Sequence, residues 1–230
     1  MIDPRIRTNW DAFNGPLEGP DVDTLYLDTR GLPTVATGVL VNSIIAMQSM
    51  AWVHADGTPA SPDEEAAEWD RVREMRPALI WTAYRSPTGL HLPHDEITRI
   101  VLERLDSDVA LLTRCWPDLP TWPWQAQAAV AALAWAVGAG SQPPGVCSAQ
   151  EWPHFHADLA RQDWRACAVS GQLAWAGNAG VRPRDMAVSA LFLLAAGMGW
   201  DQARAGWPAG PAMVAAEKAL AGLGLPESDG

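Results

Sequence analysis

The chain is poor in several residue types, and each shortage narrows what it can be. Among its 230 residues, three are cysteine, two are tyrosine and three are phenylalanine, and 16 basic residues face 27 acidic ones. The net charge of −11 argues against a nucleic-acid partner held by a basic surface. The odd number of cysteines and the lack of a CxxC spacing predict buried free thiols, with one disulfide as the alternative.

Long apolar runs are also missing. The longest, residues 126–137 and 186–198, are too short to span a bilayer, so we expect buried helices and no membrane partner. The first ten residues contain no apolar stretch of a signal peptide, which predicts synthesis in the cytoplasm without one. Acids and histidines do not follow a recognisable ligand spacing, so we expect no metal and no cofactor.

What the chain does have is a large apolar fraction, 48%, that includes thirteen tryptophans. That content and the length suit a single domain with a sizeable core. Most of the tryptophans are expected to anchor helices in this core.

One segment, residues 17–38, combines strand signals with chemistry. Short β-rich runs at Leu25–Leu27 and Thr34–Thr37 flank the turn sequence 28–31, which ends in glycine, and this pattern predicts a hairpin. Glu18 lies ten residues before Asp28, and Thr34 lies six residues after it. Two acids and a hydroxyl around one cleft are what hydrolysis of a glycosidic bond requires.

The same segment resembles the catalytic hairpin of phage-type lysozymes, the family 24 glycoside hydrolases. In that family a Glu-Gly step precedes the motif Tyr-x-Asp-Thr-x-Gly-x-x-Thr-x-Gly-x-Gly, and here Glu18-Gly19 precedes the matching residues 26–38. The chain departs from the pattern in three places: the Glu-to-Asp gap is one residue longer, Ala36 replaces a glycine, and Val39 replaces a common histidine. These changes leave both acids and the threonine in place but could reshape the floor of the cleft.

The resemblance implies a role for each acid. Glu18 would protonate the leaving oxygen, with its pKa raised by apolar neighbours such as Leu17 or Tyr26. Asp28 would stay ionised, stabilise charge at the anomeric carbon and activate a water held by Thr34. An inverting reaction of this kind needs about 6.5–9.5 Å between the carboxyl groups. By the same resemblance, the expected substrate-binding residues are Tyr26, Gly38, Trp135 and Ser170.

The resemblance also implies a fold, which the helical patterns support. We expect a predominantly α, α+β, lysozyme-like chain with a small β-hairpin lobe and a helical C-terminal lobe, joined by a long helix. The N-terminal lobe would cover about residues 1–92, with the hairpin at 24–38 and an inserted acidic helix at 61–76 whose charges form a solvated face. The rest, 93–230, would hold the linking helix and the helical lobe. Expected helices are residues 3–14, broken at Gly15-Pro16, then 42–53, 61–75, 93–112, 124–137, 152–159, 164–169 and 185–196.

The expected function is therefore a muramidase that cleaves the β-1,4 bond between N-acetylmuramic acid and N-acetylglucosamine in peptidoglycan. It would act in the periplasm or cell wall as a phage lysin or a secreted antibacterial toxin, with an immunity protein or a secretion or tail component as a possible further partner. Two alternatives stay open: a related glycan such as chitin as substrate, and a non-catalytic lysozyme-like binding or assembly module. Taken singly, Glu18, Asp28 and Thr34 are also ordinary loop, turn and strand residues.

Overall fold

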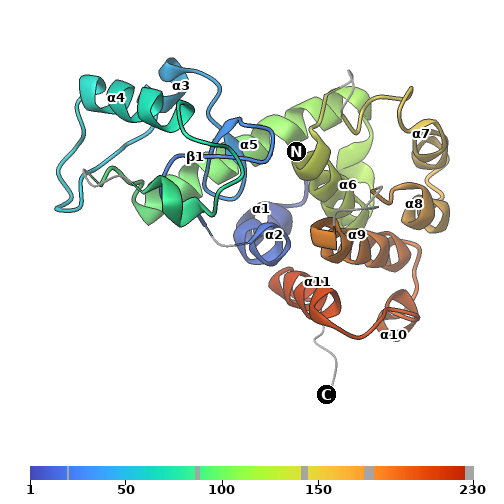
Figure 1. Cartoon of the computed structure of the whole chain (residues 1–230). Coiled ribbons are helices and arrows are strands. Elements are labelled where there is room, and N and C mark those ends of the chain that lie inside the picture. Colours follow the sequence, from blue (N-terminus) through green and yellow to red (C-terminus); the bar gives the residue numbers. More distant parts are fainter. Residues whose placement is uncertain (20, 86–88, 141–144, 174–178, 226–230) are drawn as a thin grey trace. The chain divides into compact units, whose positions relative to one another are not determined.

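The computed structural model describes residues 1–19, 21–85, 89–140, 145–173 and 179–225, and it contains two compact units (Figure 1). One unit, here the helical unit, comprises Met1–Leu17 and Leu105–Gly230; the other, the β unit, is Glu18–Arg104. The described residues are mostly helical and include one small antiparallel sheet of three strands, which confirms the predominantly α, α+β class. The units differ from the expected lobes, because the first 17 residues belong to the helical unit and the later boundary falls at 104–105 instead of 92–93.

The sheet of the β unit confirms the predicted hairpin and adds a strand to it. Strand β1, Tyr26–Leu27, pairs with β2, Pro33–Val35, and β2 pairs in turn with β3, Val39–Leu40. The predicted turn is closed by the amide of Gly31, which donates to the Asp28 carbonyl at 3.0 Å. Gly31 has φ +76°, a conformation that explains why glycine stands at the end of this turn.

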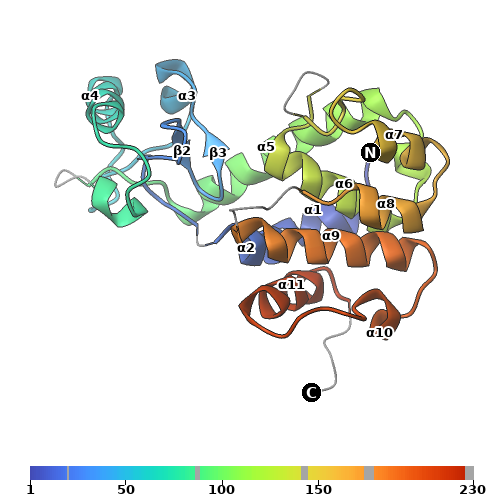
Figure 2. The ribbon, with the colours of Figure 1, turned by 45° about the vertical axis from the view of Figure 1, so that its right-hand side comes forward.

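Two helices pack beside this sheet, and only one comes close to its predicted length. Helix α4, Pro62–Arg73, begins where predicted, at a capping box formed by Ser61 and Glu64. Helix α3, Ile44–Gln48, is five residues long instead of reaching residue 53. Val53 instead exchanges backbone hydrogen bonds with His91. Figure 2 shows α3 and α4 side by side, in agreement with the contacts between them.

The burial on these helices corrects two expectations. On α3, the apolar pattern of the sequence predicts Ile45 and Met47 as core positions, but Ile45 is 77% exposed and Met47 alone is buried. On α4 the charges do not all form a solvated face, because Glu65 and Glu68 are buried. Glu68 is paired with Arg71 at 2.6 Å, which offsets the cost of removing its charge from water.

The long helix α5, His94–Cys115, confirms the prediction at 93–112, and the boundary between the two units falls within it. Its apolar residues recur at helical spacing, and the six that this spacing predicts as core positions are all buried. They are Ile97, Ile100, Val101, Leu105, Val109 and Leu112.

The helical unit is built around α9, Arg182–Ala195, which packs against α6, α8 and α11 (Figures 1 and 2). Helix α6, Trp124–Val137, is buried along most of its length, as its largely apolar sequence predicts, and it ends at Gly138. The remaining helices of this unit are α1 (Pro4–Thr8), α2 (Trp10–Glu18, whose last residue belongs to the β unit), α7 (Pro153–Ala160), α8 (Trp164–Ser170), α10 (Trp200–Ala203) and α11 (Pro211–Gly222).

Two features of this unit overturn sequence expectations. Helix α2 continues through Gly15-Pro16 to Glu18 instead of breaking there. Cys115 and Cys147 form a disulfide, so the expectation of free thiols holds only for the buried Cys167. Within the described residues, none of the helices combines the length and the apolar character needed to cross a bilayer.

Candidate active site

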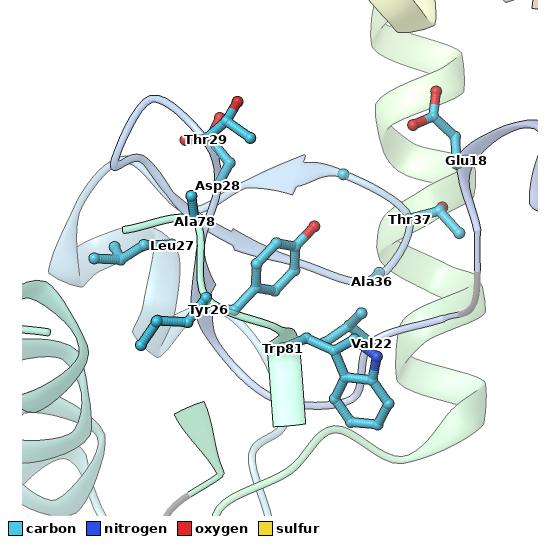
Figure 3. Close-up of a pocket in the computed structure, with 12 residues that line it drawn as sticks. Glu18, Val22, Tyr26, Leu27, Asp28, Thr29, Ala36, Thr37, Ala78 and Trp81 are labelled. Atoms are coloured by element: carbon cyan, nitrogen blue, oxygen red, sulfur yellow. The ribbon is translucent and has the colours of Figure 1, made fainter. Parts of the chain in front are cut away.

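The motif acids meet at a pocket of about 280 Å³ inside the β unit (Figure 3). Three segments supply its walls: the chain that follows α2, the sheet with its turns, and the segment after α4. The lining includes Glu18, Tyr26, Asp28 and Gly38, so four of the seven predicted site residues lie around one hollow.

Glu18 is the last residue of α2, and its side chain is exposed. Glu18 and Arg104 both lie close to Gly38. A Cβ added to this glycine would lie 3.8 Å from Glu18 Oε2 and 3.8 Å from Arg104 Nη1. Arg104 also donates a hydrogen bond to the Gly38 carbonyl. The surroundings of Glu18 therefore include a cation, whereas we expected apolar neighbours; of those expected, Tyr26 does share the pocket.

Asp28 follows β1 directly, and the turn holds its carboxyl in place. Its Oδ1 accepts hydrogen bonds from the amides of Arg30 and Leu32, each at 2.8 Å. These bonds form because aspartate at the start of a turn can bond to backbone amides a few residues later. In Figure 3, Asp28 and Glu18 lie on opposite sides of the pocket.

The pKa of Tyr26 is affected by both carboxylates. Burial raises the pKa of its phenol to about 12, with further contributions from the negative charges of Glu18 and then Asp28, while Arg104 opposes them. The hydroxyl points into the space between the two acids in Figure 3. Because this pKa lies far above neutrality, Tyr26 is a protonated hydrogen-bond donor at physiological pH.

Thr34 is placed next to this pocket but does not line it. It pairs with Tyr26 across β1 and β2, which puts the two side chains on the same face of the sheet. Thr34 is 2% exposed, however, and its hydroxyl donates to the Leu32 carbonyl at 2.9 Å. The threonines that line the pocket are Thr29 and Thr37, neither of which the sequence singled out as a site residue.

The segment that follows the inserted helix forms another wall. Ala78, Leu79 and Trp81 line the pocket, so the chain that follows the inserted helix contributes directly to the site. Tyr84 anchors the segment: it is fully buried, and its hydroxyl donates to the Arg76 carbonyl at 2.7 Å. A pattern-based search had no means of selecting Trp81 among thirteen tryptophans.

The other two predicted substrate-binding residues belong to the helical unit. Trp135 is 3% exposed and packs against Trp10, with ring centroids 5.5 Å apart. Ser170 lines a separate pocket of about 270 Å³ in that unit, and its hydroxyl donates to Asp158 Oδ2 at 2.7 Å. Their contact with a substrate stays a prediction.

The pocket thus offers two carboxyl groups, a phenol that donates, and an aromatic wall, a set suited to acid–base chemistry on a hydroxyl-rich ligand. Among the described residues, no group of three or more His, Cys, Asp or Glu is placed to hold a metal ion. No protein-family model matches the chain, and no curated protein matches it.

Proposed function

We propose that the protein is a lysozyme-like glycoside hydrolase, a muramidase that cleaves the β-1,4 bond between N-acetylmuramic acid and N-acetylglucosamine in peptidoglycan. The observation that carries the proposal is the shared pocket of Glu18 and Asp28, with a phenol between them that responds to both charges. The end of α2 at Glu18 also supports it, because the phage-type lysozymes carry their acid at the end of a helix.

In this proposal Glu18 donates its proton to the leaving oxygen as the glycosidic bond breaks. Asp28, on the other side of the pocket, takes a proton from the water that attacks the anomeric carbon, and the configuration inverts. The hydrogen bonds from Arg30 and Leu32 keep its carboxyl oriented during this step. The water is held by a threonine hydroxyl: Thr34 from the motif, or Thr37, which lines the pocket.

Peptidoglycan lies outside the cytoplasm, and the disulfide supports action there. The bond between Cys115 and Cys147 persists in oxidising compartments such as the periplasm. The identity of the neighbouring gene would decide the biological setting, a phage lysin or a secreted antibacterial toxin. A gene for an immunity protein would indicate a toxin, and a gene for a holin would indicate a lysin.

A second candidate is a non-catalytic lysozyme-like module that binds glycan or an assembly partner. The observations that favour it are the exposed carboxyl of Glu18 close to Arg104, and the Thr34 hydroxyl that already donates to Leu32. Under this function the pocket would bind sugar without cleaving it.

Turbidity and zymogram assays on purified peptidoglycan from pH 4 to 8 separate the two. We expect the wild type to clear peptidoglycan and Glu18→Gln to lose at least about 100-fold, the lower range of general acid catalysis. Glu74→Gln, at an exposed position that ends α4, removes the same charge and should retain activity. If wild type and Glu18→Gln are equally inert at every pH, the hydrolase is refuted and the binding module is favoured.

A further inference from the structure

A second pocket, of about 310 Å³, lies in the β unit and takes no part in the proposed hydrolysis. Its polar lining residues are Asp23, Thr24, Arg85 and His91. They come from the loop before β1 and from the chain on either side of residues 86–88, so the fold, and not a local sequence motif, brings them together.

One of these side chains is buried in a way that calls for a ligand. Thr24 is 5% exposed, and within the described residues its Oγ1 atom has no hydrogen-bond partner. A buried hydroxyl without a partner is costly, and such groups are rare in folded proteins. A ligand in the pocket that Thr24 lines would supply the missing bond.

The same pocket holds charges of both signs. Arg85 Nη2 lies 3.6 Å from Asp23 Oδ1, which is longer than a hydrogen bond, and that oxygen likewise has no hydrogen-bond partner among the described residues. The carboxylate and the guanidinium thus attract each other without a hydrogen bond between these two atoms. The carboxylate can still accept, and the guanidinium can still donate, a hydrogen bond to a ligand. A ligand that carries both an amine and a carboxylate would satisfy each of them.

This second pocket adjoins the candidate active site. The guanidinium of Arg85 stacks over the ring of Trp81, 4.7 Å from its centroid, and Trp81 lines the first pocket while Arg85 lines the second. Val22 and Asp23, neighbours in the chain, also line one pocket each. A branched polymer in the first pocket would therefore bring its side branch next to the second.

We propose that the second pocket binds the peptide branch of peptidoglycan, whose free amine would face Asp23 and whose free carboxylate would face Arg85. This inference rests on the proposed function. The lining favours a peptide over a further sugar ring. Its described residues include paired opposite charges, and none of them offers a tyrosine, tryptophan or phenylalanine ring on which a sugar could stack.

Binding can be measured without hydrolysis. The probe is the tripeptide L-Ala-γ-D-Glu-meso-diaminopimelate, titrated into the wild-type full-length protein and followed by NMR and calorimetry. We expect shifts at Thr24, Asp23 and Arg85, and affinity about tenfold weaker in Thr24→Val and in Asp23→Asn, the factor expected when one such hydrogen bond is lost. Thr82→Val and Asp63→Asn, at exposed positions outside the pocket, are the matched controls and should bind as the wild type does.

Thr24→Val removes a hydroxyl that has no partner and should fold at least as stably as the wild type, so a failure to fold cannot mask the result. No tripeptide binding at millimolar concentration, or equal binding by both variants and the wild type, would overturn the proposal. So would shifts at Thr24 and Arg85 caused by a chitin oligosaccharide but not by the tripeptide, since the pocket would then be a sugar subsite.

Activity assays distinguish this failure from failure of the proposed function. If the protein is a muramidase and the second pocket binds the peptide, the two variants should lose about tenfold in kcat/KM on intact peptidoglycan and nothing on glycan strands stripped of peptide. A wild type that cleaves both substrates equally, with unaffected variants, overturns the peptide site alone. A wild type that cleaves neither refutes the hydrolase, while tripeptide binding still decides the site.

Discussion

Asp185 gives the protein a pH-dependent stability whose sign follows from the structure. It lies in the first turn of α9, is 5% exposed, and accepts one hydrogen bond on Oδ1 from the amide of Leu173, at 2.8 Å. Its Oδ2 atom is buried without a hydrogen bond within the described residues. Burial raises its pKa from 3.8 to about 6, although the Leu173 amide and then Arg184 act in the opposite direction.

The raised pKa determines where stability is lost. Below about pH 4 the carboxyl is protonated in both the folded and the unfolded chain, so its burial does not lower the free energy of unfolding through its charge. Between about pH 4 and pH 6 the unfolded chain releases the proton while the folded one retains it, and stability falls as the pH rises. Above about pH 6 the penalty is constant at about 3 kcal/mol, since each pH unit is worth about 1.4 kcal/mol.

Asp185→Asn isolates this contribution. The asparagine oxygen can still accept from Leu173, and its amide group carries no charge at any pH. We expect the difference in unfolding free energy between variant and wild type, measured by urea titration, to rise by about 3 kcal/mol in favour of the variant from pH 4 to pH 7. Asp185→Ala should show the same rise from a lower starting value, because the Leu173 amide then lacks its acceptor. A difference that stays constant over this range would refute the reasoning.

Three further predictions concern packing, the disulfide and the pocket. A Cβ on Gly222 would lie 2.5 Å from the backbone C and O of Ala12, so Gly222→Ala should cost about 2–3 kcal/mol in thermal unfolding; an unchanged melting temperature contradicts this contact. Cys115→Ser opens a link to Cys147 that spans 32 residues and should cost about 3–4 kcal/mol, as reductant should for the wild type; an unchanged stability in reductant would count against the disulfide. At Gly38 an added Cβ would meet only contacts of 3.8 Å, but the residue has φ +88°, so Gly38→Ala should lower the free energy of unfolding by about 1–2 kcal/mol. Equal urea midpoints for variant and wild type would contradict this strain.

The sequence predicted those parts of the fold that depend on neighbouring residues. The capping box at Ser61 starts α4 because its cap and its glutamate lie three residues apart, within reach of each other's backbone. Helix α6 has the predicted bounds, because its sequence is apolar from Ala128 to Val137 and is ended by Gly138, which adopts φ +89°. The turn after Asp28 forms where predicted for the same local reason.

Features that depend on distant residues escaped prediction. Residues after α3 fit a helical pattern, yet Val53 pairs with His91, a partner 38 residues away, and the tertiary contact prevails over the local preference. Cys115 and Cys147 are far apart in sequence, and spacing alone does not indicate a pair that folding brings to a Cα distance of 6.1 Å. The continuation of α2 through Pro16 also defied a local rule.

The candidate site divides in the same way. Glu18, Asp28, Tyr26 and Gly38 could be named from one stretch of 21 residues, since the motif lies within the chain that forms the pocket. Arg104 could not be named, because it contacts Gly38 across 66 residues of sequence. The apolar pattern of its helix predicts which residues are buried and does not predict the contacts of a polar residue such as Arg104. Trp81, which comes from the segment after α4, has no counterpart in the motif.

These unpredicted residues bear on how an acidic protein would hold an anionic polymer. The net charge of −11 slows the encounter of like-charged partners. Once bound, charges more than about 8 Å away are largely screened at physiological ionic strength, so the local cations matter most. Arg104 and Arg85 lie at the two neighbouring pockets, and each comes from outside the motif. Under the proposed function, the motif would supply the chemistry of cleavage, while the long helix and the segment after α4 would supply the positive charge that retains the substrate.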